Sequence, residues 1–456
     1  MRVHFTNLGC KLNQAEIERL AREFTAAGHR VVGSLAEADL HVVNSCTVTH
    51  VAARGSRKAA GRARRAGLPL RTVLTGCHVS ERPEEAARAA RLAGVDLVVP
   101  NREKDRLLSL VHAAFPDAAP PEPELPVPYV PLPFGNTRAL VKVEDGCNMR
   151  CAFCIIPLTR GRQKSRALPE VVAEVRALVH AGYREIVVTG VQISAYRSGD
   201  AHLYELVRAI LGETAVPRLR LTSIAPWDLD ERLLSLWGDW SERRLCRHLH
   251  LSLQSGSTAT LRRMRRPYTA EGYLALLGRV REAIPGVAVT TDVIAGFPGE
   301  TAADFEESLA AVEAAGFARV HVFPYSARPG TEAESLPGHV APEEKKVRVD
   351  RLLAAADRAD RAFRRAHLGK RETVLWEKPR DGMGQGLTDN YIRVVSEEGA
   401  GLWNRFTEVE LVDLAEDGVA GRVVREQAIS KTVIAERGMG VAVPGDRLRP
   451  RGPAPQ

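Results

Sequence analysis

Three cysteines lie close together near the middle of the chain, in the run Gly146–Cys154. Cys147, Cys151 and Cys154 have C-x3-C-x2-C spacing and follow an apolar stretch at residues 139–143 that is typical of a strand. Three such thiolates can hold three corners of a [4Fe–4S] cube and leave the fourth iron open. An open iron can bind the amino and carboxylate groups of S-adenosylmethionine and pass one electron into its sulfonium. The run therefore predicts a cluster that cleaves this cofactor into methionine and a 5′-deoxyadenosyl radical.

Two other interpretations of this run are a zinc site and three unrelated cysteines. Structural zinc is normally held by four ligands from Cys or His. No Cys or His occurs in the twenty residues after Cys154. The spacing therefore favours the cluster over zinc.

Three further cysteines end predicted strands in the first part of the chain. Cys10, Cys46 and Cys77 follow apolar segments at residues 3–6, 40–43 and 72–75, and a helix is expected at residues 16–27. In a parallel α/β sheet the carboxyl ends of the strands meet at one edge, where ligands bind. We therefore expect a second three-cysteine cluster there. The alternative is that each is a small buried apolar residue, which is how we interpret the isolated Cys246.

Length and composition limit the possible classes of protein. The chain has 456 residues, 45% of them hydrophobic and 26% charged, which indicates a globular protein of two or three domains. No apolar run approaches the roughly 20 residues needed to cross a bilayer, so we expect a cytoplasmic protein without a membrane partner. An odd number of cysteines, seven, argues for metal binding over disulfides. The net charge of +8 suggests an anionic partner such as nucleic acid.

Strand and helix patterns alternate through the middle of the chain and predict an α/β fold. Six strand–helix units suggest a partial parallel (β/α)6 barrel that is open on one side. The expected strands are 139–143, 185–190, 218–223, 247–253, 287–294 and 318–323. The expected helices are 169–181, 203–212, 229–237, 270–284, 301–315 and 342–367.

Composition changes divide the chain into three domains. An N-terminal open α/β domain covers residues 1–113, a proline-rich linker 114–137, and the partial barrel 138–368. Short alternating segments at 369–437 predict a small antiparallel β-barrel of the oligonucleotide-binding kind. The tail at 438–456 is expected to be disordered.

Small and polar residues end several strands of the predicted barrel. In barrels of this kind the loops at the carboxyl ends of the strands carry the active site. Glycine there lets the backbone approach a ligand, and Gln or Ser can bind ribose or carboxylate groups, although such residues are also common in ordinary turns. The residues expected to bind the cofactor are Thr189, Gly190, Gln192, Ser252, Gln254 and Gly296.

Three basic runs lie next to these candidate sites. Such runs can bind RNA phosphates, or they can simply be solvated surface. The candidate RNA contacts are Arg54, Arg57, Lys58 and Arg62 after Cys46, Arg160 and Arg162 after the central cysteine run, and Arg263 and Arg265 after the Gln254 loop.

From Val3 to about Val424 the chain resembles the methylthiotransferases of the radical SAM superfamily. The resemblance rests on the motifs around the six cysteines, on the 251–257 and 261–266 stretches and on Gly296–Thr301. It implies an N-terminal domain with one [4Fe–4S] cluster, a radical SAM barrel with a second, S-adenosylmethionine as cofactor, and a C-terminal TRAM barrel that binds substrate. The electron donor is expected to be a flavodoxin or ferredoxin; the sulfur source is not indicated.

Three branches of this family differ in substrate. They modify N6-threonylcarbamoyladenosine in tRNA, N6-isopentenyladenosine in tRNA, or an aspartate of a ribosomal protein. The stretches at residues 9–14, 46–49, 320–326 and 388–391 are most similar to the threonylcarbamoyladenosine branch. The resemblance then implies that the radical removes the hydrogen at C2 of the target adenine beside the anticodon, and that the N-terminal cluster delivers the methylthio group.

Other classes of function stay open at this point. A one-cluster radical RNA methylase would not need Cys10, Cys46 and Cys77, and an electron carrier would not need the Gln254 and Gly296 loops. A zinc-dependent RNA-binding protein is the third alternative.

Overall fold

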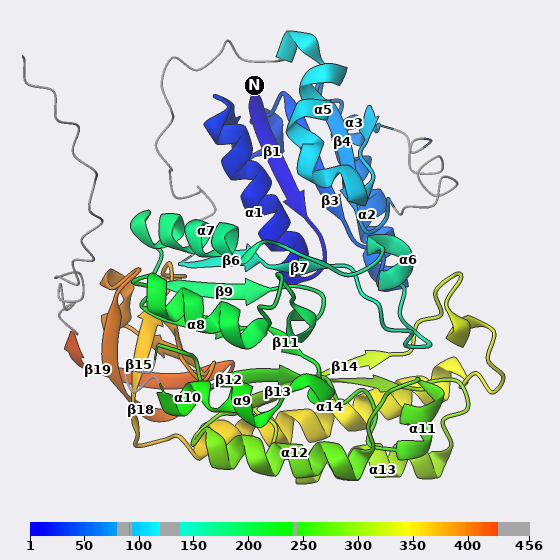
Figure 1. The fold of residues 1–456 in the computed structure, drawn as a ribbon, viewed down its shortest axis with the longest axis vertical. Coiled ribbons are helices and arrows are strands. Elements are labelled where there is room, and N and C mark those ends of the chain that lie inside the picture. Colours follow the sequence, from blue (N-terminus) through cyan, green and yellow to red (C-terminus); the bar gives the residue numbers. More distant parts are fainter. Residues whose placement is uncertain (80–90, 92–93, 119–136, 240–243, 427–456) are drawn as a thin grey trace, which may run out of the picture. The chain divides into compact units, whose positions relative to one another are not determined.

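Five parallel strands form the first sheet of the computed structural model, which describes residues 1–79, 91, 94–118, 137–239 and 244–426. The strand order is β2-β1-β3-β4-β5. These strands are β1 Arg2–Asn7, β2 Arg30–Val31, β3 Leu40–Ser45, β4 Arg71–Gly76 and β5 Leu97–Val98; the helices are α1 Lys11–Ala26, α2 His50–Ala60, α3 Arg62–Arg65 and α5 Leu107–Ala114 (Figure 1). The three predicted strands are present, and α1 begins five residues before the expected helix because it starts directly after Cys10.

The middle of the chain contains the six predicted strand positions, all parallel to their neighbours. They are β6 Arg138–Lys142, β9 Glu185–Thr189, β10 Arg218–Leu221 with β11 Ser223–Ile224, β12 His248–Leu251, β13 Ala288–Ala295 and β14 Arg319–Pro324. The third strand is interrupted at Thr222, so β10 pairs with β9 while β11 pairs with β12. The sheets β10-β9-β6 and β11-β12-β13-β14 together make the predicted partial barrel.

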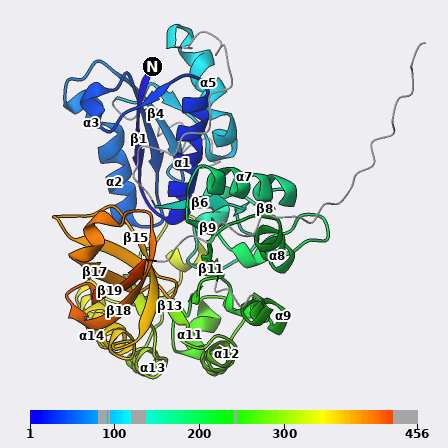
Figure 2. The same cartoon turned by 90° about the vertical axis from the view of Figure 1, so that its left-hand side faces the viewer.

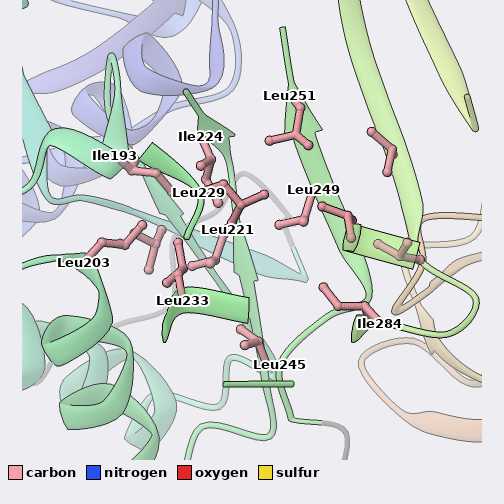
Figure 3. Packing of buried hydrophobic residues seen from close by; sticks show 14 of the residues in the cluster. Ile193, Leu203, Leu221, Ile224, Leu229, Leu233, Leu245, Leu249, Leu251 and Ile284 are labelled. Atoms are coloured by element: carbon pink, nitrogen blue, oxygen red, sulfur yellow. The ribbon is translucent and has the colours of Figure 1, made fainter. Parts of the chain in front are cut away.

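Helices between these strands bury one large apolar core. Figure 3 shows Leu221, Leu249 and Leu251 from the strands packed with Ile224 and Leu229. The helices are α6 Ile156–Arg160, α7 Leu168–His180, α8 Leu203–Glu213, α9 Glu231–Leu234, α10 Leu236–Asp239, α11 Thr258–Arg263, α12 Ala270–Ala283, α13 Ala302–Ala314 and α14 Pro342–Arg365; the short β7 Glu144–Asp145 and β8 Lys164–Ser165 pair antiparallel. None of the helices in these ranges has the length and apolar character needed to cross a membrane.

The N-terminal domain contacts the partial barrel at both of its edges. On one edge, the backbone N–H of Leu140 in β6 donates to the carboxylate of Glu18 in α1, at 3.4 Å. On the other edge, Arg328 follows β14 and donates to the Thr47 hydroxyl at 2.7 Å. The open side between β6 and β14 is therefore spanned by the N-terminal domain.

A closed barrel of five strands follows α14, as the sequence predicted, although one of its strand pairs is parallel instead of antiparallel. Its order is β15-β16-β17-β19-β18 (Figure 2). The strands are β15 Arg371–Trp376, β16 Gly384–Thr388, β17 Arg393–Ser396, β18 Phe406–Ala415 and β19 Gly418–Glu426. Most of the predicted linker, 119–136, and the predicted tail lie outside the described residues.

Buried charges attach this small barrel to the larger one. Glu185 is 0% exposed and accepts hydrogen bonds from Arg218 at 2.5 Å and from Arg220 at 2.7 Å. Both guanidinium groups also donate to backbone carbonyls of residues 387–389 in the small barrel. Burial alone would raise the pKa of Glu185, but the arginines outweigh it and lower the pKa to about 2.

We expect Glu185→Gln to lower the free energy of unfolding by about 3 kcal/mol, because it leaves buried arginine charge uncompensated. The stabilisation from Glu185 is present above its ordinary pKa and is lost as pH falls toward about 2. Denaturant unfolding at neutral and acidic pH measures this. Glu306→Gln, in an exposed ion pair with Arg351, is the matched control and should change stability by less than about 1 kcal/mol.

Candidate functional site

The first three cysteines come together at the carboxyl edge of the N-terminal sheet. Cys46 and Cys77 directly follow β3 and β4, whose final residues Ser45 and Gly76 are paired in register. Cys46 and Cys77 are buried, whereas Cys10 is exposed. Asn13 lies between Cys10 and Cys77, because its Oδ1 is 4.0 Å from both of their sulfurs.

A glycine makes this close approach possible. Gly9 has φ +103°, and a Cβ there would lie 2.9 Å from the Cys46 sulfur. Any other residue would therefore be strained and would collide with the thiol. The close packing against Cys46 thus explains why a glycine precedes Cys10.

The second group of cysteines lies in the loop between β7 and α6. The backbone N–H of Met149 donates to the Cys147 sulfur at 3.4 Å, and that of Cys154 donates to the Cys151 carbonyl at 3.0 Å. Arg266 donates to the Cys151 sulfur at 3.5 Å. All three cysteines therefore belong to one short loop, and the thiol of Cys151 has the cation of Arg266 beside it.

Both groups contain thiols whose protons a bound metal would have to displace. Burial raises the pKa of Cys77 to about 11 and that of Cys154 to about 12, so a bound metal would have to displace their protons. Within the ranges given above, no three Cys, His, Asp or Glu side chains converge on a single ion position. A cube needs no such convergence, because each thiolate binds a different iron, whereas zinc requires its ligands around one point.

Arg160 lies between the two groups and is 3% exposed. Its Nε donates to the Cys77 sulfur at 3.1 Å, and its other nitrogens donate to Glu16 at 3.0 Å and to Asp145 at 2.8 Å. The guanidinium thus reaches from the central domain into the N-terminal cysteine site. The prediction that Arg160 contacts RNA is wrong, because its donors are used inside the protein.

The charges around Arg160 leave one positive charge in excess. Arg160, Lys104 and Lys142 supply three cations, and in the part of the chain that the structure describes their ion pairs are with the two carboxylates of Glu16 and Asp145. Burial would raise the pKa of Glu16, but these cations hold it well below its usual range. A thiolate at Cys77 would balance the set, which is what a cluster ligand supplies.

The residues predicted to bind the cofactor are distributed along the carboxyl edge of the partial barrel. The Gln192 side chain donates to Asp228 at 2.9 Å, and its Oε1 lies 3.9 Å from the Cys147 sulfur. The Ser252 hydroxyl donates to Asp292 at 3.2 Å. Thr189 is buried at the end of β9, and its carbonyl accepts from Val143 in the neighbouring strand.

Gln254 and Glu144 each have a buried oxygen at this edge with no partner among the described residues. One is Oε1 of Gln254, a residue with φ +65°. The other is Oε1 of Glu144, whose Oε2 accepts from the backbone N–H of Gln192 at 2.9 Å. Such oxygens fit a ligand that brings its own donors, such as an amino group or ribose hydroxyls.

Sequence reasoning missed Glu144, although it stands three residues before Cys147. Burial raises its pKa to about 8. Gly190 lies directly against it, since a Cβ there would be 2.7 Å from Glu144 Oε2. Gly296 directly follows β13. A Cβ at this glycine would meet Lys345, and the backbone N–H of Gly296 donates to Glu300 at 3.0 Å.

The remaining candidate RNA contacts differ in whether their positive charge is paired with a carboxylate. Arg265 pairs with Glu332 at 2.8 Å, and Arg263 pairs with Asp304 at 2.9 Å. The other candidates are exposed on α2, on α3 and after α6: Arg54, Arg57, Lys58, Arg62 and Arg162.

Comparisons with known proteins match this arrangement of domains. The radical SAM superfamily matches residues 141–312, and an uncharacterized protein family, UPF0004, matches residues 2–99. Threonylcarbamoyladenosine tRNA methylthiotransferase MtaB of Bacillus subtilis is 33% identical over 441 residues, covering 93% of this chain and 96% of that protein. The chain belongs to the radical SAM methylthiotransferase family. It is therefore a transferase, and its superfamily implies S-adenosylmethionine and a [4Fe–4S] cluster.

Relatives with another substrate are equally similar. A tRNA-2-methylthio-N(6)-dimethylallyladenosine synthase of Jannaschia sp. is 35% identical over 431 residues, covering 91% of this chain and 92% of that protein. Among solved structures, the radical S-adenosylmethionine methyltransferase TsrM from Kitasatospora setae has a TM-score of 0.54 at 17% identity, covering 73% of this chain and 74% of that one. This likeness concerns the fold alone.

We expect iron analysis after anaerobic reconstitution to find about eight irons per chain, since two tetranuclear clusters are predicted. Replacing Cys10, Cys46 and Cys77 together by Ala should reduce this to about four. The same substitution at Cys246, which is buried away from both groups, should leave the iron content unchanged. About four irons in the wild type would contradict a second cluster.

Arg160→Met should lower the free energy of unfolding by about 3–5 kcal/mol, because it leaves Glu16 and Asp145 short of a buried counter-charge. Arg162→Met is the matched control two residues away, because Arg162 is exposed. It should change stability by about 0.5 kcal/mol or less. Urea unfolding of both variants, prepared anaerobically, measures the difference; equal stabilities would contradict the role of Arg160 in joining the domains.

Proposed function

We propose that this chain is a tRNA methylthiotransferase that converts N6-threonylcarbamoyladenosine beside the anticodon to its 2-methylthio derivative, using two [4Fe–4S] clusters. The observation that carries the proposal is the N-terminal group of thiols, on Cys10, Cys46 and Cys77, held against the radical SAM domain through Arg160. A radical methylase or an electron carrier with one cluster has no need of it.

The thiols of Cys147, Cys151 and Cys154 would hold one cluster, and the N-terminal thiols would hold the other. When bound, these clusters and S-adenosylmethionine supply the one-electron chemistry and the sulfur transfer that an aromatic C–H bond requires. The free oxygens of Gln254 and Glu144 would accept hydrogen bonds from the cofactor. The N-terminal domain, by spanning the open side of the barrel, would keep water from the reacting groups.

The RNA would approach across α2, α3 and the turn after α6. Arg54, Arg57 and Lys58 are exposed there, just after Cys46, and Arg162 follows the second cysteine group. Arginines at such positions suit bidentate contacts with phosphates. The small C-terminal barrel, with its oligonucleotide-binding type of fold, supports RNA as the partner.

The choice of substrate among relatives does not follow from overall identity. Four threonylcarbamoyladenosine enzymes are 33–36% identical to this chain, and four dimethylallyladenosine enzymes are 34–35% identical. The first substrate is supported by the stretches at residues 9–14, 46–49, 320–326 and 388–391. A reduced flavodoxin or ferredoxin is the proposed electron donor.

Two cysteine variants should separate the two steps of the reaction. Cys151→Ala should abolish cleavage of S-adenosylmethionine, because it removes a ligand of the cluster that is predicted to bind the cofactor. Cys46→Ala should spare cleavage and lose methylthiolation. The measurements are 5′-deoxyadenosine by chromatography and tRNA nucleosides by mass spectrometry. Loss of cleavage in both variants would overturn this division of roles.

A further inference from the structure

A polar wall lines the interior of the partial barrel on β12, β13 and β14. The His250 ring bonds to Thr290 at 3.0 Å and to Asp292 at 3.1 Å. Asp292 is the register partner of His321 on the next strand, so their side chains lie on the same face. His321 is exposed, which leaves this face of β14 open to a ligand.

One cation from another domain reaches this wall. Lys11 follows Cys10 at the start of α1, and its ammonium lies 5.2 Å from the ring centre of Tyr391. Tyr391 belongs to the small C-terminal barrel and stacks on His248 of β12, with the ring centres 4.7 Å apart. The charge of Lys11 also acts on His248 and His321, where it helps to lower both pKa values, after burial as the main cause. Three domains therefore meet at Lys11.

Lys11 differs from the other cations around Tyr391 in lacking an anionic partner. Arg138 pairs with Glu377, and Arg220 pairs with Glu185. Lys11 is exposed and makes no hydrogen bond or ion pair with any residue that the structure describes. Burial would raise the pKa of Tyr391, but the three cations lower it to about 8, so the potential there is positive.

The ring of Phe323 adds an apolar surface to the same wall at the carboxyl end of β14. Phe323 is 42% exposed and follows His321 by two residues on β14, so it lies on the same face of the strand. An unpaired ammonium at the Tyr391 end of this wall suits a substrate that carries an anionic group. Asp292, a carboxylate on this wall, already accepts from His250 at 3.1 Å and from Ser252 at 3.2 Å.

We infer that Lys11 is a specificity-determining residue that binds the free carboxylate of the threonylcarbamoyl group. This inference rests on the proposed function, since threonine linked through its nitrogen to the adenine keeps its carboxylate, whereas a dimethylallyl group is uncharged. The carboxylate would give Lys11 the counter-charge that the protein does not supply. An uncharged substituent would displace water from the ammonium without replacing its hydrogen bonds, which is costly.

The test is the affinity of the full, cluster-reconstituted chain for anticodon stem–loop RNAs, measured by fluorescence anisotropy. The RNAs differ at one adenine, which carries the threonylcarbamoyl group, the same group with its carboxylate converted to a neutral carboxamide, a dimethylallyl group, or no substituent. We expect the wild type to bind the carboxylate RNA at least about tenfold more tightly than the carboxamide RNA, as for a charge-assisted hydrogen bond.

Lys11→Met should reduce this ratio to nearly one, and Lys11→Arg should keep most of it because the charge is retained. Lys346→Met, which removes an exposed lysine on α14, is the matched control and should keep the full ratio. Iron content establishes that the change beside Cys10 has left the cluster in place. If Lys11→Met loses iron, two measurements remain. The affinity of the wild type for the carboxylate RNA relative to the carboxamide RNA still tests the contact with the carboxylate. The same comparison with Lys11→Arg tests the role of Lys11.

Two failures have different meanings. In the first, the wild type binds the carboxylate RNA more tightly than the carboxamide RNA, and an iron-loaded Lys11→Met variant shows the same preference. This result would overturn the inference and leave the proposed function standing. A wild type that binds the dimethylallyl RNA more tightly than the threonylcarbamoyl RNA would overturn the proposed substrate itself.

Discussion

The guanidinium of Arg160 is the contact on which the arrangement of the two cysteine groups depends. It is only six residues beyond Cys154, yet it donates to Cys77 and to Glu16 inside the N-terminal domain. A buried arginine is tolerated only where its charge and donors are satisfied. Glu16, Asp145 and Asn13 provide this, and they fix the position of one cysteine group relative to the other.

A second set of buried charges plays the corresponding role at the opposite end of the strands. Glu185, Arg218 and Arg220 lie on β9 and β10, and they bind backbone carbonyls of the small barrel. Both junctions rely on arginine forks, whose geometry matches carboxylates and carbonyls. Ionic contacts of this kind specify a single orientation better than apolar surfaces do, so the strand edges that carry the cysteines and the polar wall keep a defined geometry.

Much of this architecture was predictable, because strand ends and helix faces depend on local sequence. The six barrel strands and the five-stranded C-terminal barrel are confirmed. The interruption at Thr222 and the division of the expected 229–237 helix into α9 and α10 were not predicted, since both depend on how neighbouring strands and helices pack. The burial of Arg160 was not predictable either, because its partner Glu16 lies 144 residues earlier in the chain. Glu144 was not predicted, because a single carboxylate forms no sequence motif and its burial depends on the fold.

The spanning of the barrel's open side has a consequence for how the protein matures. Thr47 and Arg328 are 281 residues apart, so the contact between them forms only after most of the chain has been synthesised. Contacts of such long range are entropically costly and form late in folding. Arg160, which lies 83 residues after Cys77, covers that cysteine in the finished fold and leaves it 2% exposed. Cys10 stays exposed in the same fold, so the N-terminal site keeps one thiol that incoming iron can reach after the domains have closed.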